Sequence, residues 1–310
     1  MDSRRSLAPR TVLLLTVPPL LWAGNAVVGK LLVGSVPPLQ LNALRWWLAL
    51  ALLLPLGWRV LRRPQGLLER WPYLALLGGL GVGSYNALQY LAVQTSTPLN
   101  VTLIAGSMPL WMMAVGAIAY GNRPTPRQLA GAALSLAGIA IVLSRGSWAA
   151  LAQIRFVAGD LYMLVASALW AVYSWMLARP PASMRGERKP AWNWAEALLA
   201  QIVFGVLWAS AGAGVEAVVA PMHVEWSTGL VAALFYLALG PSLVAYRCWG
   251  IGVATAGPAI ASFFANLTPA FAALLSALWL AELPSAYHVA AFALIVAGIV
   301  VSSPPRRPAD

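Results

Sequence analysis

The sequence predicts an all-α polytopic membrane protein whose ten transmembrane helices form two inverted five-helix repeats. Composition is the first reason, because 60% of the 310 residues are hydrophobic and only 9% are charged, against about 25% charged in a typical soluble domain. The second reason is that ten apolar windows each hold the roughly 20 residues that cross a bilayer as a helix. The third is an internal repeat, in which Thr95–Ile139 aligns without a gap with Thr255–Ile299.

The ten helices are expected to follow one another through short connections. Arg4, Arg5 and Arg10 precede the first helix, as they would a signal peptide. Its apolar run is longer than a signal core, however, and nine further spans follow, so we expect the first helix to be retained. The predicted spans are 11–33, 38–57, 71–93, 97–119, 126–144, 158–178, 193–213, 228–251, 256–279 and 285–303.

Prolines recur in register in the two halves of the chain. Pro98, Pro109 and Pro124 of the first half align with prolines 160 residues later. These are Pro258, Pro269 and Pro284. A proline inside a helix leaves a carbonyl without its hydrogen bond, and lipid offers that carbonyl no partner. Because each such proline is costly, the recurrence of prolines at corresponding positions of the two halves is not expected to arise by chance. We predict one five-helix repeat over residues 11–144 and a second over residues 158–303. Because five is odd, the second repeat is expected to enter the bilayer upside down, as in many transporters.

Basic residues predict the orientation of these spans. With the first segment placed in the cytoplasm, fifteen Lys and Arg fall in inner segments and only Arg145 and Arg155 in outer ones. Cytoplasmic loops of membrane proteins carry such an excess. We therefore expect a multi-pass protein of the cytoplasmic (inner) membrane with both termini cytoplasmic. The same clustering explains the net charge of +11 through contact with the lipid bilayer, without a nucleic-acid partner.

Residue types exclude several kinds of chemistry. One cysteine, Cys248, cannot form an internal disulfide. The two histidines, His223 and His288, fall in or beside connecting loops, and this count is too low for a histidine-cysteine metal site. We expect no metal, no cofactor and no catalytic residues, because the spans offer no nucleophile with a neighbouring base.

Polar and aromatic residues within the spans predict a substrate site. Burying an amide side chain in lipid costs free energy unless it is hydrogen-bonded or faces a water-filled cavity. Ligand sites combine aromatic walls with a few polar groups. A packing or interfacial role remains open for each aromatic residue. The predicted substrate-binding residues are Trp22, Asn25, Arg45, Tyr85, Gln89, Trp111, Trp170, Tyr173, Tyr246 and Trp249.

Pro109 and Pro269 lie inside the fourth and ninth spans and should kink them. Each ring would free the carbonyl four residues back, at Ala105 and Ala265. Matched interruptions in two halves point to the central site of a transporter, although a purely structural kink explains them equally well. We expect the kinks to shape the cavity.

Charged residues inside the spans have different expected roles. A buried charge costs about 2.5–3.5 kcal/mol on insertion scales and normally faces a partner or cavity. We expect Lys30 to reach the headgroups and Arg45 to serve a cavity, while Arg247 could do either.

The acidic residues lie toward helix ends, whereas a proton-driven carrier normally has a carboxylate deep in the membrane. We place Asp160 at the start of the sixth span, Glu196 near the start of the seventh and Glu282 near the end of the ninth. Glu216 and Glu225 are assigned to the outer loop between spans seven and eight. Facilitated or exchange transport is therefore expected rather than a carboxylate-driven proton pump.

Over residues 11–303 the chain resembles the EamA-like ten-helix branch of the drug/metabolite transporter superfamily. The resemblance implies two inverted five-helix repeats around a central cavity, alternating access and a small metabolite or drug that is often exported, aromatic amino acids among them. The family usually has Glu after the fourth helix; Glu282 keeps it in the second copy, but Asn122 replaces it in the first. The matching segments are Trp22-Ala-Gly-Asn25 running to Lys30, Arg45, the Pro109 segment followed by Gly121 to Gly138, Gly159-Asp160 leading to Trp170, the Pro269 segment, and Glu282 to Gly298.

We therefore predict a secondary transporter that moves a small-molecule substrate across the membrane by alternating access. Export of amino acids, including aromatic ones, is the sharper expectation; drugs, nucleosides or sugars are alternative substrates. A channel or a structural membrane protein is the alternative of another class, but a channel would carry continuous polar rings, whereas these spans offer scattered polar positions. A monomeric state is compatible with this interpretation.

Overall fold

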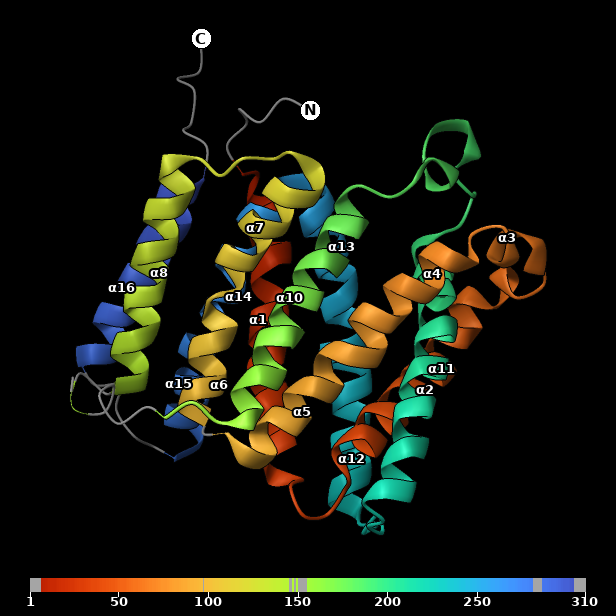
Figure 1. Cartoon of the computed structure of the whole chain (residues 1–310), viewed down its shortest axis with the longest axis horizontal. Helices are drawn as coiled ribbons and strands as arrows, with labels where there is room; N and C mark the ends of the chain where they lie inside the picture. Colours follow the sequence, from red (N-terminus) through yellow and green to blue (C-terminus); the bar gives the residue numbers. More distant parts are fainter. Residues whose placement is uncertain are drawn as a thin grey trace.

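A computed structural model of the chain describes residues 7–96, 98–144, 147, 149, 155–280 and 286–303. These residues form an all-helical bundle whose chain passes repeatedly between two ends of the molecule (Figure 1). The predicted helical class is thus confirmed. Among the described residues, five stretches are long and apolar enough to cross a membrane in one piece: Pro9–Gly29, Pro38–Val60, Ala158–Ala178, Trp194–Val219 and Thr228–Ala256.

The first half of the chain contains four long or composite helical passes and a closing helix. A short 3₁₀ turn, Trp58–Val60, follows α2, and a π-helical segment, Gly79–Ser84, joins α4 to α5 without a loop. The α-helices are α1 (Pro9–Leu31), α2 (Pro38–Gly57), α3 (Pro64–Leu68), α4 (Trp71–Gly78), α5 (Tyr85–Thr95), α6 (Pro98–Gly106), α7 (Met108–Tyr120) and α8 (Pro126–Ser144).

The second half likewise has two long helices, a pass interrupted by a π segment, a broken pass and a last helix, but no counterpart of α3 among the described residues. A second π-helical segment, Ala238–Val244, joins α12 to α13, and two 3₁₀ turns, Ala182–Met184 and Gly186–Arg188, lie between α10 and α11. The α-helices are α10 (Ala158–Ala178), α11 (Trp194–Val219), α12 (Thr228–Leu237), α13 (Ala245–Ala256), α14 (Pro258–Ala265), α15 (Leu267–Leu280) and α16 (Ala286–Ser302).

One predicted boundary is wrong in a way that matters for Glu216. The seventh span was expected to end at residue 213, but α11 continues to Val219, so Glu216 lies in the helix and is buried rather than in the outer loop. Its carboxylate accepts the backbone N–H groups of Leu39 at 3.0 Å and Gln40 at 2.9 Å. The N–H groups in the first turn of α2 have no partner within the helix, and the residue before it supplies no side-chain cap. The Glu216 carboxylate therefore stabilises the start of α2.

The π-helical segments occupy matching positions in the two halves. A π turn leaves carbonyls outside the usual helix ladder, and side chains satisfy some of them. The amide of Asn42 donates to the carbonyls of Val82 and Gly83, and the Ser242 hydroxyl donates to the carbonyl of Leu237. Trp22 donates to the carbonyl of Pro241 at 3.3 Å. The irregular backbone is therefore held by named side chains rather than left unpaired.

The helices that contain Pro109 and Pro269 are broken rather than bent. Ser107 separates α6 from α7, and Asn266 separates α14 from α15, so each proline falls in the first turn of a new helix, where its missing N–H is harmless. The Thr268 hydroxyl donates to the carbonyl of Ala265 at 2.7 Å. The carbonyl that the sequence identified as freed at Ala265 thus has a local partner.

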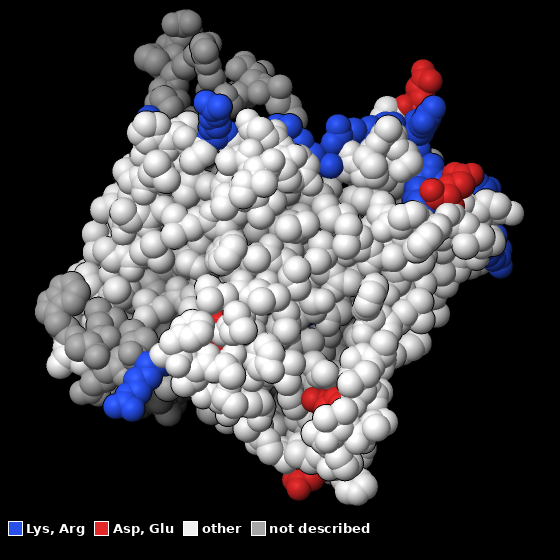
Figure 2. All heavy atoms as spheres, viewed as in Figure 1, with Lys and Arg blue, Asp and Glu red and all other residues white. Residues whose placement is uncertain are grey.

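Small residues bring helix backbones into contact, as membrane helices commonly do. Helix α8 packs along α16, and a Cβ added at Gly131 would lie 2.7 Å from the carbonyl oxygen of Gly298. A Cβ at Gly78 of α4 would lie 2.6 Å from the carbonyl oxygen of Gln201 in α11. The chain enters α1 and leaves α16 at the same end of the molecule (Figure 1), and Figure 2 shows Lys and Arg gathered mainly along that end.

Candidate functional site

A small cavity lies where α1, α5, α6, α7 and α10 meet the break between α14 and α15. Its volume is about 90 Å³, roughly the space of three water molecules at about 30 Å³ each. Five of the ten side chains predicted to bind substrate line it, and Pro269 lines it as well. The full lining is Trp22, Asn25, Tyr85, Asn86, Gln89, Val101, Thr102, Ala105, Gly106, Met108, Trp170, Ala265, Asn266, Thr268 and Pro269.

Trp170 of α10 is the centre of the aromatic wall. Its ring centroid lies 5.4 Å from that of Trp22 in an edge-to-face arrangement and 4.8 Å from that of Tyr85. Aromatic pairs at such distances contribute about 0.5–1.5 kcal/mol beyond area burial. The wall therefore has a fixed shape, and it presents ring surface from α1, α5 and α10 to the cavity.

Three predicted residues lie behind this wall instead of lining the cavity. Tyr173, Tyr246 and Trp249 are each buried, with ring centroids 4.8, 5.4 and 5.8 Å from that of Trp170. Their polar atoms are engaged elsewhere: Trp249 donates to the Ser174 hydroxyl, and Tyr246 donates to a carbonyl of the first π segment. In this conformation they position Trp170.

The polar side of the cavity is a cluster of amides. Asn25 of α1 donates to the side-chain oxygens of Asn86 at 3.4 Å and Gln89 at 3.3 Å, both on α5. Its own oxygen accepts hydrogen bonds from Arg45 at 3.0 Å and from the Tyr90 hydroxyl at 2.9 Å. Asn25 is therefore the side chain that connects the cavity to the residues behind it.

Arg45 stands behind Asn25 and outside the cavity lining. Its guanidinium is fully buried and donates to Asn25, to the Tyr90 hydroxyl at 2.8 Å and to the Ser242 hydroxyl at 2.7 and 3.1 Å. All three partners are neutral, so the positive charge is hydrogen-bonded by them without a neutralising carboxylate among these contacts. Because Ser242 belongs to the second π segment, Arg45 also joins the two halves of the chain.

Asn266 is the functional candidate that the sequence prediction missed. It sits at the break between α14 and α15, is 1% exposed, and lines the cavity. Both its Nδ2 and Oδ1 atoms lack a hydrogen-bond partner among the described residues. A buried polar atom left unpaired costs about 1–3 kcal/mol, which calls for a functional explanation. The sequence feature that could have identified Asn266 is its position, an amide three residues before Pro269 in an otherwise apolar span.

The remaining predicted residues lie away from the cavity lining. Trp111 and Pro109 are on α7, where Trp111 packs partly buried against the main core and Pro109 is buried. Arg247 is exposed and stacks 3.8 Å over the Trp194 ring. Glu282 lies outside the described residues, as does the side chain of Lys30.

Carboxylates of the described helices are buried at helix ends, not on the cavity lining. Asp160 accepts the backbone N–H of Val157 at 2.9 Å and the hydroxyl of Ser96. Glu196 accepts the backbone N–H of Asn193 at 2.7 Å, completing a capping box at the start of α11. With Glu216 at the start of α2, all three act as helix caps.

Comparison with known proteins assigns the chain to a family. The model of the EamA-like transporter family matches residues 9–144 and again residues 157–303. The chain belongs to the EamA-like transporter family. It is therefore a transporter and a multi-pass membrane protein, which confirms the resemblance predicted from the sequence.

Similar proteins match more than nine-tenths of this EamA-like transporter. It is 27% identical over 95% of its length to an uncharacterized transporter of Archaeoglobus fulgidus, 97% of which is covered. It is 28% identical over 92% of its length to the aromatic amino acid exporter YddG of Ancylobacter novellus, 93% of which is covered. A solved crystal structure superposes with a TM-score of 0.74 at 25% identity, over 94% of this chain and 95% of the other.

Proposed function

We propose that this EamA-like transporter is a secondary carrier that exports amino acids, aromatic ones among them, by alternating access. The observation that carries the proposal is Asn266, a buried amide with two unpaired polar atoms on the lining of an otherwise aromatic and amide-lined cavity. A substrate with both a donor and an acceptor would satisfy it. The similarity to an aromatic amino acid exporter supports this substrate class.

The lining suits the two ends of an aromatic amino acid. Rings of Trp22, Tyr85 and Trp170 offer faces and edges on which an aromatic side chain stacks. An amide group supplies two N–H donors and a carbonyl acceptor, so Asn266 and the Asn25 cluster can bind both a carboxylate and an ammonium group. The charge of Arg45, hydrogen-bonded to Asn25, favours the carboxylate at that end of the cavity.

We further propose that the carrier consists of two inverted five-helix repeats, over residues 11–144 and 158–303, with both termini in the cytoplasm. The matching positions of the two π segments and of the breaks at Ser107 and Asn266 support the repeats. The gathering of basic residues at one end supports the orientation in an inner membrane. The cavity would then lie at the interface of the repeats, where transporter sites usually lie.

The size of the cavity supports alternating access. Sites for small ligands measure about 300–1,000 Å³, whereas this one measures about 90 Å³. A bound amino acid therefore requires the surrounding helices to move apart. Substrate that binds the opened forms shifts the populations of inward-open and outward-open states.

Counterflow in proteoliposomes tests the proposal. Vesicles loaded with unlabelled phenylalanine should accumulate labelled phenylalanine transiently and saturably, since a carrier exchanges faster when both faces are supplied. The Asn266→Leu variant should need a higher concentration of substrate for this exchange, and Asn122→Leu, the same change in the connection after α7, should leave it unchanged. Flux that rises linearly with concentration would indicate a pore, and an absence of exchange for every amino acid tested would refute the substrate class.

A further inference from the structure

A second hollow, larger than the first, lies at the end of the molecule where basic residues gather. It has a volume of about 850 Å³ and is formed by the turn after α2, by α3, and by the chain that leads into α11. We call it the basic groove. Its lining is Trp58, Arg59, Val60, Arg62, Arg63, Gln65, Gly66, Pro190, Ala191, Trp192, Asn193 and Glu196.

The groove carries a positive charge that the described residues leave unneutralised. Arg59, Arg62 and Arg63 are exposed on its rim, and none of them forms an ion pair within the described part of the chain, where the ion pair found is Arg70 with Glu69. Glu196 is the acidic residue on the lining, but its carboxylate already caps α11 through the N–H of Asn193. An anion that enters the groove therefore meets three guanidinium groups.

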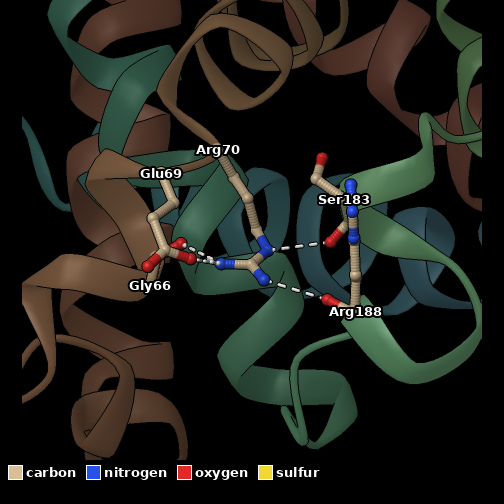
Figure 3. Close-up of polar contacts among 5 residues, drawn as sticks. All are labelled: Gly66, Glu69, Arg70, Ser183 and Arg188. Atoms are coloured by element: carbon tan, nitrogen blue, oxygen red, sulfur yellow. Dashed lines mark hydrogen bonds and ion pairs between the residues drawn. The ribbon is translucent and has the colours of Figure 1, made fainter.

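The walls of the groove are held in place by Arg70, whose contacts are drawn in Figure 3. Its guanidinium donates to the carbonyls of Ser183 at 3.0 Å and Arg188 at 2.9 Å, and on its own side to the carbonyl of Gly66 at 3.1 Å. These bonds tie the connection between α10 and α11 to α3. Because the walls are preformed, less ordering entropy is lost when a ligand binds.

Aromatic residues give the groove a defined inner surface. The Arg62 guanidinium stacks 3.7 Å over the Trp58 ring, which restrains that arginine, and Trp192 lies below the Arg70 guanidinium at 5.9 Å. A guanidinium that packs over a ring can still direct N–H groups at a tetrahedral anion in a bidentate manner. Phosphate oxygens have the geometry and charge that such a set of donors prefers.

Apolar side chains lie beside the charged rim. Leu61 and Leu68 are 40% and 64% exposed next to the arginines, and Trp58 follows directly after α2, where an aromatic residue marks the membrane interface. A ligand with a phosphate and adjoining acyl chains matches this pairing of charge and apolar surface. Basic pockets between helices at the cytoplasmic face bind anionic lipid headgroups in this way.

We propose that the basic groove is a binding site for a phosphate group, and that its expected source is the headgroup of an anionic phospholipid. The site is independent of the transport cavity, because the two linings share no residue. Binding of a headgroup there would link α3 and the α10–α11 connection to the lipid leaflet on that side.

Lipid binding by the purified full-length protein tests this proposal. Native mass spectrometry should show phosphatidylglycerol retained in preference to phosphatidylcholine. The triple variant Arg59→Gln, Arg62→Gln, Arg63→Gln should lower phosphatidylglycerol affinity at least about tenfold. The control Arg123→Gln, Arg179→Gln, Arg185→Gln removes the same charge outside the groove and should change the affinity by less than about twofold.

Two further measurements separate a free phosphate from a lipid headgroup, and a specific loss of binding from misfolding of the variant. Replacing the three groove arginines by lysine keeps the charge but removes the guanidinium fork, and should restore binding only partly. If inorganic phosphate displaces phosphatidylglycerol at micromolar concentration, a soluble phosphate is the ligand and the site itself is supported. Equal losses in the groove and control variants would show general charge attraction and overturn the proposal, as would equal retention of the two lipids.

Discussion

Replacing Asn266 by leucine should make the protein more stable and a worse transporter. The side chain is 1% exposed and both of its polar atoms are unpaired among the described residues, which costs about 1–3 kcal/mol for each group that is left dry. The adjoining cavity of about 90 Å³ has room for water, which lowers that penalty. We therefore expect the Asn266→Leu variant to gain about 1 kcal/mol.

The loss of function follows from the same two atoms. A substrate that pairs with both the Nδ2 and the Oδ1 of Asn266 would lose two hydrogen bonds, each worth about 0.5–1.5 kcal/mol. The sum of about 1–3 kcal/mol corresponds to an affinity that is weaker by about 5- to 150-fold. Half-saturation in counterflow should rise by a factor within that range.

Asn42→Leu is the matched control, because it makes the same change at a second buried asparagine. Asn42 is 0% exposed, and its amide donates to Val82 at 3.0 Å and Gly83 at 3.2 Å in the first π segment. Its Oδ1 has no partner among the described residues, but two buried carbonyls lose a donor in the variant, so a net loss of stability of about 1 kcal/mol is expected. Thermal unfolding midpoints in one detergent should move in opposite directions for the two variants. A lower midpoint for Asn266→Leu, or unchanged transport, would refute the reasoning.

Three further expectations follow from the structure. Replacing Gln89 or Trp170 by alanine should impair counterflow while membrane insertion stays intact, and normal kinetics in both variants would argue against the cavity as the substrate site. Gly131→Ala should lower the thermal midpoint by the equivalent of about 1–3 kcal/mol because its Cβ meets the carbonyl of Gly298 at 2.7 Å; Gly250→Ala, which meets nothing within 4 Å, should raise it slightly. Transport in liposomes should proceed without a pH gradient, because the buried carboxylates among the described residues, Asp160, Glu196 and Glu216, cap helices. Its abolition by a protonophore alone would contradict this.

The helices were predictable because lipid imposes a simple rule on sequence. An apolar window of about 20 residues must satisfy its backbone internally, and the predicted 38–57, 126–144 and 158–178 agree with α2, α8 and α10. The end of α11 was not predictable in this way. Glu216 ends the apolar window, yet it lies in the helix because it caps α2, which is a tertiary contact between distant segments.

The candidate site was predictable only in part. Polar and aromatic residues within a span can be read from sequence, and three that were predicted on that basis, Trp22, Asn25 and Trp170, line the cavity. Which side of a helix faces the cavity depends on its neighbours. Tyr173 lies three residues after Trp170, but its ring is turned toward the Gln201 side chain behind the wall. A single sequence carries no signal for that choice.

The Arg45 cluster suggests how substrate and conformation are coupled in the proposed carrier. Arg45 lies seven residues into α2, about 10 Å along the helix from its start, at the end away from the basic residues. Its bonds to Ser242 hold the two halves together there. Asn25 accepts from Arg45 through its oxygen and also lines the cavity. A substrate carboxylate can engage only its Nδ2, where it competes with the oxygens of Asn86 and Gln89. A carboxylate that also accepted from Arg45 would compete with Ser242 for its guanidinium. It would thereby weaken a contact between the two halves of the proposed carrier and shift the populations of its states.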